Sequence, residues 1–201
     1  MRVPRVQRKV LVTDEEQTAW TDTRLVRECL NGSEAAWSAL IDKYKNLIFS
    51  IPIKYGFSPD DATDIFQAVC LELLSELPKL RKPKALPKWI MQVTAHKCFH
   101  HRRQLNRTEN PSAEDEPMEQ STPARAEGIL RQAEEEQALR QVMSGLPPRC
   151  RQLIQMLFFE EPARPYQALA AELGLSQGSI GFIRQRCLER LRKGLSKAGF
   201  S

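Results

Sequence analysis

The chain has 201 residues, of which 41% are hydrophobic and 27% are charged, and its formal net charge is +5 at pH 7. This composition is typical of a globular protein with apolar material for one large core or two small ones, and the positive charge favours an anionic partner such as nucleic acid or a membrane surface. No apolar run approaches the roughly 18 residues that cross a bilayer, and the basic start lacks the apolar core of a signal peptide, so we expect a cytoplasmic protein without membrane insertion.

Apolar residues recur at helical spacing through the first half of the chain. A first helix is expected over residues 22–30. A second should begin with Ser33 as its N-cap, and Pro52 should bend or end it. A third should begin at Ser58, since Pro59 suits the first helical position and acids stabilise the first turn. Its expected apolar face comprises Ile65, Phe66, Val69, Leu73 and Leu74.

A fourth helix is expected after Pro83 and Pro87, and it contains the sequence WIMQVTAHKCFHHRR, residues 89–103. The following segment, 108–127, has six acids, one base and three prolines, which is typical of a flexible linker. Helical spacing then returns. The further helices are expected over residues 129–143, 151–160, 166–173 and 176–197.

We therefore predict an all-α protein with two small helical domains joined by an acidic flexible linker. No stretch shows the alternating pattern of a strand convincingly. The expected divisions are an N-terminal extension (1–20), a first domain (21–104), the linker (105–127) and a second domain (128–201).

The clearest motif is YQALAAELGLSQGSIGFIRQRCLERLRK, residues 166–193. A short helix is followed by Gly174, which can adopt the left-handed conformation of a tight turn, and by Ser176 as the expected N-cap of a second helix. Two short helices joined in this way form a helix-turn-helix. Residues 140–201 carry ten bases against four acids. We therefore prefer a helix that reads the major groove of DNA over a hairpin with a solvated basic face.

Residues 80–103 carry seven bases and no acid, with Trp89, Phe99 and all three histidines of the chain among them. Bases and aromatic rings together hold a nucleic-acid backbone and stack on unpaired bases, so nucleic acid is favoured over a merely solvated helix. His96 and His100 are four residues apart and could share a metal. We expect none, because a zinc site needs three or four ligands and no carboxylate lies nearby in the sequence.

On the third helix, Asp60, Asp61 and Asp64 cluster with Gln67. The helix dipole explains part of this cluster, since carboxylates in the first turn stabilise a helix. Asp64 and Gln67 lie one turn apart on one face and could instead meet a basic partner surface. The residues alone leave both interpretations open.

The five cysteines, at positions 29, 70, 98, 150 and 187, form no CxxC pair. An odd and dispersed set argues for reduced thiols rather than a disulfide framework. Cys29, Cys70, Cys150 and Cys187 lie within helical patterns, where a cysteine usually serves as a small buried apolar residue.

Together these features resemble bacterial RNA polymerase sigma factors of the small, two-domain extracytoplasmic-function type, from about Asp22 to Leu195. The family's DAxDxxQ motif, which binds the clamp helices of the largest polymerase subunit, reads DATDIFQ here. Its W-x-x-x-I-A-x-N-x-x-x-D pattern, which recognises and melts the minus-ten promoter element, aligns with Trp89 through His100. The helix-turn-helix resembles the domain that reads the minus-thirty-five element, and its GSIGFIRQRCLERLR is close to the family's usual ending.

The resemblance implies three groups of functional residues. Those implied to bind the polymerase core are Asp61, Asp64, Ile65, Phe66 and Gln67. Those implied to recognise and open minus-ten DNA are Lys88, Trp89, His96, Lys97, His100, His101, Arg102 and Arg103. Those implied to contact the minus-thirty-five element, around the helix-turn-helix of residues 166–185, are Ser176, Gln177, Gly178, Ser179, Gly181, Phe182, Arg184 and Arg186.

Some residues depart from the family pattern. His96 and His100 stand where Asn and Asp are common, so the melting surface is more basic than usual and the melted sequence is expected to be atypical. Ala168 stands where an acid is frequent, and Pro52 is unusual in its helix. These departures bear on the promoter sequence rather than on the class of protein.

The implied function is promoter-specific transcription initiation, with no enzymatic reaction and no cofactor in this chain. The implied partners are core RNA polymerase, through its clamp and flap, and promoter DNA; many family members are also held inactive by an anti-sigma protein. A stand-alone helix-turn-helix regulator would account for residues 166–193 but would leave DATDIFQ and the basic helix unused. A metal-dependent enzyme built on His96, Cys98 and His100 would require bound zinc, and no nucleophile–base pair or phosphate-binding loop supports it.

Overall fold

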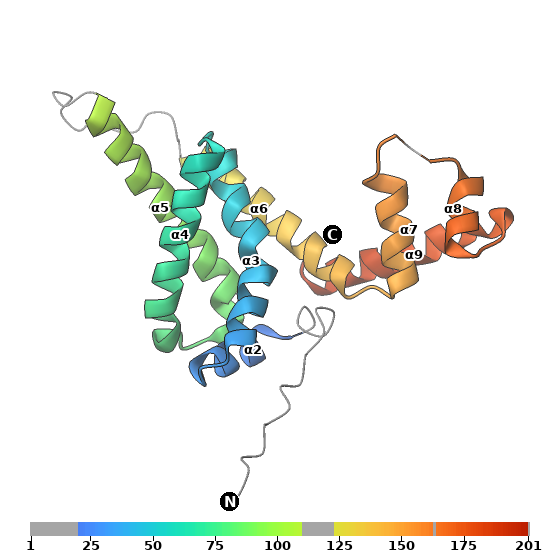
Figure 1. The fold of residues 1–201 in the computed structure, drawn as a ribbon, viewed down its shortest axis with the longest axis horizontal. Helices are drawn as coiled ribbons and strands as arrows, with labels where there is room; N and C mark the ends of the chain where they lie inside the picture. Colours follow the sequence, from blue (N-terminus) through green and yellow to red (C-terminus); the bar gives the residue numbers. More distant parts are fainter. Residues whose placement is uncertain (1–19, 110–122, 163, 201) are drawn as a thin grey trace, which may run out of the picture.

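The computed structural model describes residues 20–109, 123–162 and 164–200. The regular elements in these ranges are all helical, as predicted, and none of these helices is long and apolar enough to cross a membrane. The α-helices are α2 (Asp22–Leu30), α3 (Glu34–Lys54), α4 (Pro59–Glu76), α5 (Leu86–Glu109), α6 (Pro123–Ser144), α7 (Pro148–Phe158), α8 (Tyr166–Leu173) and α9 (Ile180–Lys197), and the short 3-10 helices are η1 (Leu77–Lys79), η2 (Pro83–Ala85) and η3 (Gln177–Ser179). In Figure 1, α2 to α5 form one group, α7 to α9 form another, and α6 runs between them.

Helices α2, α3 and α4 begin at side-chain caps. The Ser33 hydroxyl accepts a hydrogen bond from the Ala36 amide at 3.3 Å, so the predicted cap of α3 is confirmed. At α4 the Ser58 hydroxyl accepts from the Asp61 amide, while the Asp61 carboxylate accepts from the Ser58 amide. This reciprocal capping box satisfies two backbone donors that a helix start otherwise leaves unpaired.

Prolines lie near the C-terminal end of α3 and at the start of α5. The α3 helix continues through Pro52 and ends at Lys54, followed by Gly56 with φ +81°. The helix thus ends within one turn of the proline, which removes one backbone hydrogen bond from the helix. Pro87 lies inside the first turn of α5, not before the helix as expected from the sequence, because the first turn needs no amide donor.

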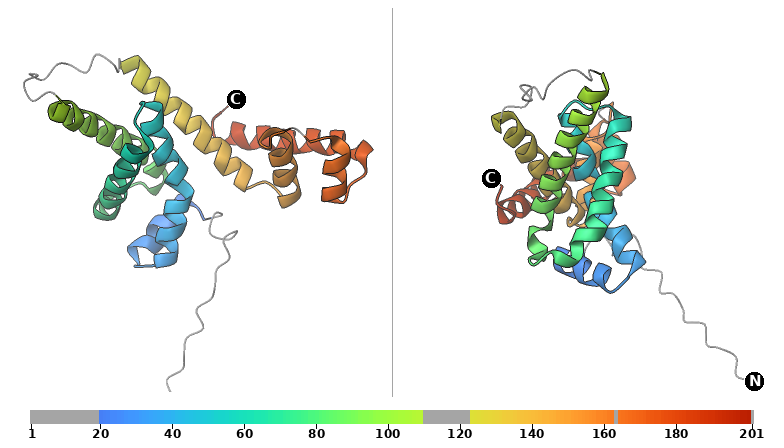
Figure 2. Two further views of the ribbon diagram at one scale, coloured as in Figure 1. Left: turned by 45° about the horizontal axis from the view of Figure 1, so that its top comes forward. Right: turned by 90° about the vertical axis from the view of Figure 1, so that its left-hand side faces the viewer.

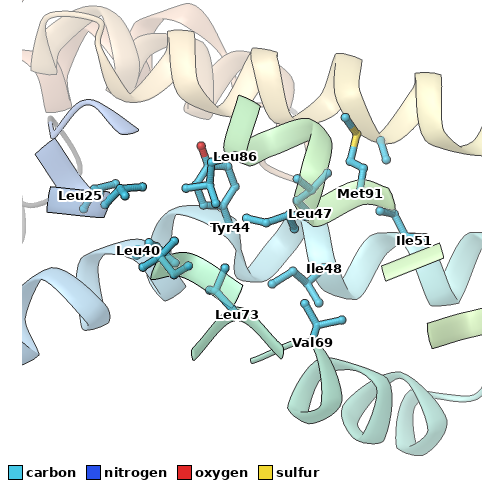
Figure 3. Packing of buried hydrophobic residues seen from close by; sticks show 14 of the residues in the cluster. Leu25, Leu40, Tyr44, Leu47, Ile48, Ile51, Val69, Leu73, Leu86 and Met91 are labelled. Carbon is cyan, nitrogen blue, oxygen red and sulfur yellow. The ribbon is translucent and has the colours of Figure 1, made fainter. Parts of the chain in front are cut away.

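A continuous apolar core holds the first group together. Leu40, Leu47 and Ile48 of α3 are fully buried and pack against Val69 of α4 and Leu86 of α5 (Figure 3). Each fully buried aliphatic side chain contributes roughly 1.5–3 kcal/mol relative to exposure. The predicted apolar face of α4 is correct for three residues and wrong for one: Ile65, Val69 and Leu73 are buried, Phe66 is partly buried, and Leu74 is 54% exposed.

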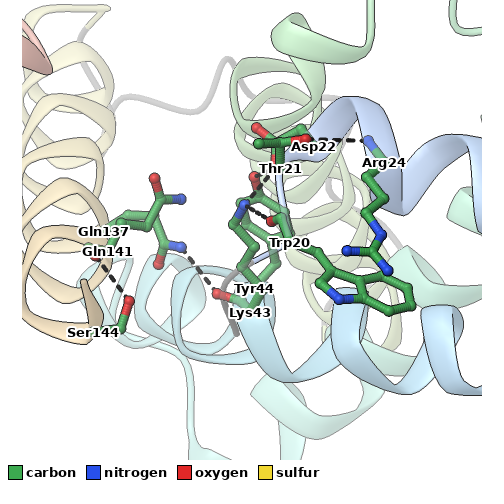
Figure 4. Close-up of polar contacts among 9 residues, drawn as sticks. All are labelled: Trp20, Thr21, Asp22, Arg24, Lys43, Tyr44, Gln137, Gln141 and Ser144. Carbon is green, nitrogen blue, oxygen red and sulfur yellow. Dashed lines mark hydrogen bonds and ion pairs between the residues drawn. The ribbon is translucent and has the colours of Figure 1, made fainter. Parts of the chain in front are cut away.

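A polar network joins α2 to α3 beside this core (Figure 4). The Asp22 carboxylate accepts from Lys43 Nζ at 2.7 Å and from the Tyr44 hydroxyl at 2.6 Å. Burial and the neighbouring Asp22 carboxylate raise the pKa of Tyr44, so its hydroxyl stays a donor. Lys43 also donates to the Trp20 carbonyl at 3.2 Å, which ties the start of the described chain to α3.

Helix α6 packs on the first group although it leads into the second (Figure 2, left). Ala133 is fully buried in the first core, the Gln137 amide donates to the Lys43 carbonyl at 2.9 Å, and Lys54 pairs with Glu136 at 2.9 Å. Helices α5 and α6 both extend into the segment expected to be a linker, up to residue 109 and from residue 123. The remainder of that segment lies outside the described residues, as do residues 1–19 of the expected extension.

The second group contains the helix-turn-helix. Gly174 has φ +62° at the end of α8, as the turn requires, and Leu175 packs against the small core of this group. The prediction that Ser176 caps the next helix with its side chain is wrong: its carbonyl accepts from Ser179 instead, and η3 precedes α9. In this 3-10 turn the Ser179 and Ile180 amides donate to the carbonyls of Ser176 and Gln177. The Ser179 amide, which a Ser176 hydroxyl cap would bond, therefore already has a partner.

The expectation that all cysteines are reduced is also wrong. Cys150 of α7 and Cys187 of α9 form a disulfide, with Cα atoms 5.3 Å apart, while Cys29, Cys70 and Cys98 are free. The two residues are 37 positions apart, and only the packing of α7 against α9 brings them together. Sequence spacing carries no sign of such a pair.

Candidate nucleic-acid and partner interfaces

The exposed face of α4 combines acidic and apolar residues. Asp60, Asp64, Gln67, Leu71 and Leu74 follow one another at steps of four and three residues, which places them on one side of the helix. All five are exposed, Leu71 by 68% and Leu74 by 54%. Of the residues predicted to bind the polymerase core, Asp64 and Gln67 lie on this face. Leu71 was not predicted to belong to this exposed face, and Leu74 was expected on the apolar face of the helix instead.

Asp61 lies beside this face but is engaged within the domain. Its carboxylate accepts from the Ser58 hydroxyl at 2.6 Å and lies 2.8 Å from Nε2 of His101 on α5. The hydrogen bonds from Ser58 and His101 lower the pKa of Asp61. Both of its carboxylate oxygens therefore have partners, and its position fixes the start of α4 against α5.

Ile65 and Phe66, the other residues predicted to bind the core, point toward the domain interior. Ile65 is 2% exposed, and the Phe66 ring stacks on Phe49 of α3 with centroids 4.7 Å apart. These two side chains hold α4 on α3. They place Asp64 and Gln67 on the opposite side, where a partner can reach them.

Helix α5 presents a ridge of polar and aromatic side chains to solvent. The exposed residues that form this ridge are Lys88, Gln92, His96, Phe99, His100 and Arg103. The Nε2 atoms of His96 and His100 are 3.0 Å apart, so one imidazole donates a hydrogen bond to the other. Phe99 is 44% exposed and meets the His100 ring edge-on at 5.8 Å. Gln92 belongs to this ridge by its helical spacing and was missed in the sequence analysis.

The remaining predicted minus-ten residues make contacts within the domain. Lys97 pairs with Glu72 of α4. The Arg102 guanidinium lies 4.1 Å over the Phe57 ring and donates to the Tyr55 carbonyl at 3.1 Å. His101 pairs with Asp61, as described above, and Trp89 is partly buried against the core. The sequence stretch 80–103 contains no acid, but Glu72 of α4 neutralises the charge of Lys97.

Among the described residues, no third metal ligand lies beside the two histidines of the ridge. Cys98, the nearest thiol in sequence, is 2% exposed on the other side of α5, and burial raises its pKa to about 12. Within residues 20–109, 123–162 and 164–200, no three His, Cys, Asp or Glu side chains gather as a metal site requires. The contacts between the rings of the ridge are a hydrogen bond between His96 and His100 and edge-on ring packing.

Helix α9 presents a second exposed face. Ile180 and Cys187 are fully buried, and Phe182, Gln185 and Arg186 project from the opposite side, all exposed. The Arg186 guanidinium lies 5.7 Å from the centroid of the Phe182 ring. The sequence analysis included Phe182 and Arg186 but missed Gln185, which shares their face by helical spacing.

The other predicted minus-thirty-five residues are placed around this face. Arg184 donates to the Tyr166 hydroxyl at 2.6 Å, which ties α9 to α8. The Ser179 hydroxyl donates to the Ser176 carbonyl at 2.7 Å. Gln177 and Gly178 are exposed in η3, and Gly181 is partly buried in the first turn of α9.

Comparison with known proteins finds similarity in both groups of helices. A family model described as Sigma-70 region 2 matches residues 40–108, and one described as Sigma-70, region 4 matches residues 142–193. A protein described as probable RNA polymerase sigma factor RfaY, from Xanthomonas campestris pv. campestris, is 27% identical over 154 residues, or 74% of this chain. The match spans 38% of that relative's own length. With region 2 followed by region 4, the chain belongs to the sigma-70 family of RNA polymerase sigma factors, in its extracytoplasmic-function type.

Proposed function

We propose that this chain directs core RNA polymerase to promoters, with region 2 binding the polymerase and opening the minus-ten element while region 4 holds the minus-thirty-five duplex. The observation that carries the proposal is the pairing of two exposed surfaces on one rigid domain. These are the acidic and apolar face of α4 and the basic and aromatic ridge of α5. Both surfaces are exposed, and each has the chemistry of a different partner.

The face of α4 suits a helical protein surface of the polymerase clamp. Leu71 and Leu74 together provide an apolar centre, and Asp64 and Gln67 provide a polar rim one turn away. Apolar side chains at the centre of an interface supply most of its affinity, whereas charged groups at the rim select the partner and speed association. Asp61 supports this face indirectly, by fixing the first turn of α4.

The ridge of α5 suits an unpaired DNA strand. Phe99, His96 and His100 offer rings on which bases can stack, and Lys88 and Arg103 offer charges for the phosphates. Base stacking on aromatic side chains contributes roughly 1–3 kcal/mol per base and tolerates many sequences. This balance between stacking and charge supports strand capture more than the reading of intact duplex.

Run-off transcription with core polymerase tests the proposal over a library of promoter fragments from the source genome. The test variant is Asp64→Ala with Gln67→Ala, and the matched control is Glu34→Ala with Asn46→Ala, an exposed acid and amide on α3. We expect the chain to yield transcripts from defined sites, the test variant to lose them, and the control to retain them. Absence of any core-dependent transcript, together with failure to co-elute with core polymerase, would refute the proposal.

The same variant distinguishes the chain from a stand-alone regulator. A regulator that binds an operator without polymerase uses the helix-turn-helix alone, so the change on α4 would leave all of its function intact. In our proposal the variant still binds duplex DNA through α9 but no longer recruits polymerase. A gel-shift assay run beside the transcription assay separates the two outcomes.

An anti-sigma protein is a further partner that we propose for the space between the two regions. An open cavity of about 1330 Å³ lies between α5, α6 and α9. Its apolar lining includes Met91, Leu130 and Leu191, and Glu134 and Arg192 lie among its charged residues. A cavity of this kind fits the apolar side of an amphipathic helix. Loss of polymerase binding on addition of the partner would test it.

A further inference from the structure

Phe182 is the most exposed large apolar side chain of region 4 among the described residues. It is 65% exposed in the first turn of α9. Ile180 and Cys187 are fully buried on the side of α9 that faces the domain, and Phe182 lies about 200° around the helix from Ile180. The ring therefore projects away from the domain and contributes nothing to its core.

The neighbours of Phe182 on this face are polar. Gln185 and Arg186 are exposed beside it, and the Arg186 guanidinium lies 5.7 Å from the ring centroid. Hydrogen-bonding side chains of this kind read base edges in the major groove, and the first residues of a recognition helix lie closest to those edges. A phenyl ring can neither donate nor accept such a hydrogen bond. Beside any base the ring leaves a polar edge without a hydrogen bond, which costs binding free energy. The base favoured at this position is therefore one that offers an apolar group to the ring.

Thymine is the base with an apolar group in the major groove, its 5-methyl group. We infer that Phe182 packs against the methyl group of a thymine in the minus-thirty-five element, and that Arg186, held beside the ring, contacts the neighbouring base or phosphate. This inference rests on the proposed function, and it states which base region 4 selects at one position. Thymine selectivity here arises from burial of one methyl group, with no hydrogen bond.

Uracil tests the inference, because it pairs as thymine does but lacks the methyl group. Duplexes bound by the full chain are first selected from a random library, and each thymine of the selected element is then replaced by uracil in turn. We expect one replacement to weaken binding about fourfold, the ratio that corresponds to burial of one methyl group. The variant Phe182→Ala should bind the thymine and uracil duplexes equally, and Phe182→Leu should retain part of the difference.

Phe159→Ala is the matched control, since Phe159 is 64% exposed at the end of α7 in the same region. It should keep the preference for thymine over uracil. Equal thermal melting curves of the variants would show that each remains folded, as the exposure of both rings leads us to expect.

Two results would overturn the inference and leave the proposed function standing. One is a wild-type chain that binds every uracil duplex as tightly as its thymine parent. The other is a thymine preference that persists unchanged in Phe182→Ala. A selection that returns no common sequence, or one absent from the transcribed promoter fragments, would instead contradict the proposed function.

Discussion

Reduction of the disulfide between Cys150 and Cys187 should destabilise region 4 selectively. The bond joins α7 to α9 across 37 residues. In the chain-entropy account, a crosslink that closes a loop of this length stabilises the folded state by about 4 kcal/mol, with typical measured values of about 2–4 kcal/mol. Region 4 has only a small core of its own, so a loss of this size is a large fraction of the stability of such a unit.

The distribution of tryptophans allows each region to be followed separately. The chain has three tryptophans, and Trp20, Trp37 and Trp89 all pack on the first core. Tryptophan emission therefore reports region 2, whereas far-ultraviolet circular dichroism reports the helices of both regions. In urea titrations, a reductant should add an early transition to the dichroism curve and leave the emission curve in place.

A double variant, Cys150→Ala with Cys187→Ala, provides the control. It should show the early transition with or without reductant, since it has no disulfide to lose. The reasoning would be refuted if reductant left the dichroism curve unchanged, or if it shifted the emission curve by the same amount. The first result would mean that the crosslink does not stabilise region 4, and the second that the two regions unfold together.

Four further changes test particular contacts. Asp61→Asn should lower the urea midpoint of region 2 at pH 7, because folding lowers the pKa of this carboxyl group. The effect should begin to shrink only below about pH 4, the ordinary pKa of an aspartate, and should disappear as the pH falls through the lowered pKa of the folded state. Ala133→Leu should destabilise region 2 by about 1–3 kcal/mol through overpacking, measured by tryptophan emission, whereas Ala124→Leu on the exposed side of α6 should not. Gly174→Ala should cost region 4 about 1–2 kcal/mol in the dichroism titration, because its φ is +62°. Iodoacetamide should modify Cys98 slowly at pH 8 and quickly in urea, because burial raises its pKa to about 12.

The parts of the fold that could be predicted depend on contacts between residues close in sequence. Ser33 and Ser58 cap helices through amides three residues away, and Gly174 needs only its own backbone freedom to end α8. Such signals act within one helical turn, so a single sequence contains them in full. The order of helices and the helix-turn-helix follow from the same local chemistry.

Contacts between distant residues could not be predicted in this way. His101 meets Asp61 across 40 positions, and the disulfide spans 37. Leu74 was assigned to the core because it continues an apolar pattern, but α4 packs through Val69 and Leu73 and turns Leu74 to solvent. An apolar residue at the edge of a helical stripe is assigned correctly only when the neighbouring helix is known.

Contacts with residues distant in sequence also change the charge that residues 80–103 present to a partner. Counted along the sequence, residues 80–103 hold seven bases and no acid, which suggests binding dominated by charge. In the fold, Lys97 pairs with Glu72 and Arg102 lies over the Phe57 ring, so fewer of the seven bases are available to phosphates than the count indicates. Each phosphate contact contributes about −0.7 to the salt slope for a single strand. The ridge should therefore capture the strand with a shallower salt dependence and a larger share of stacking on Phe99 and the histidines.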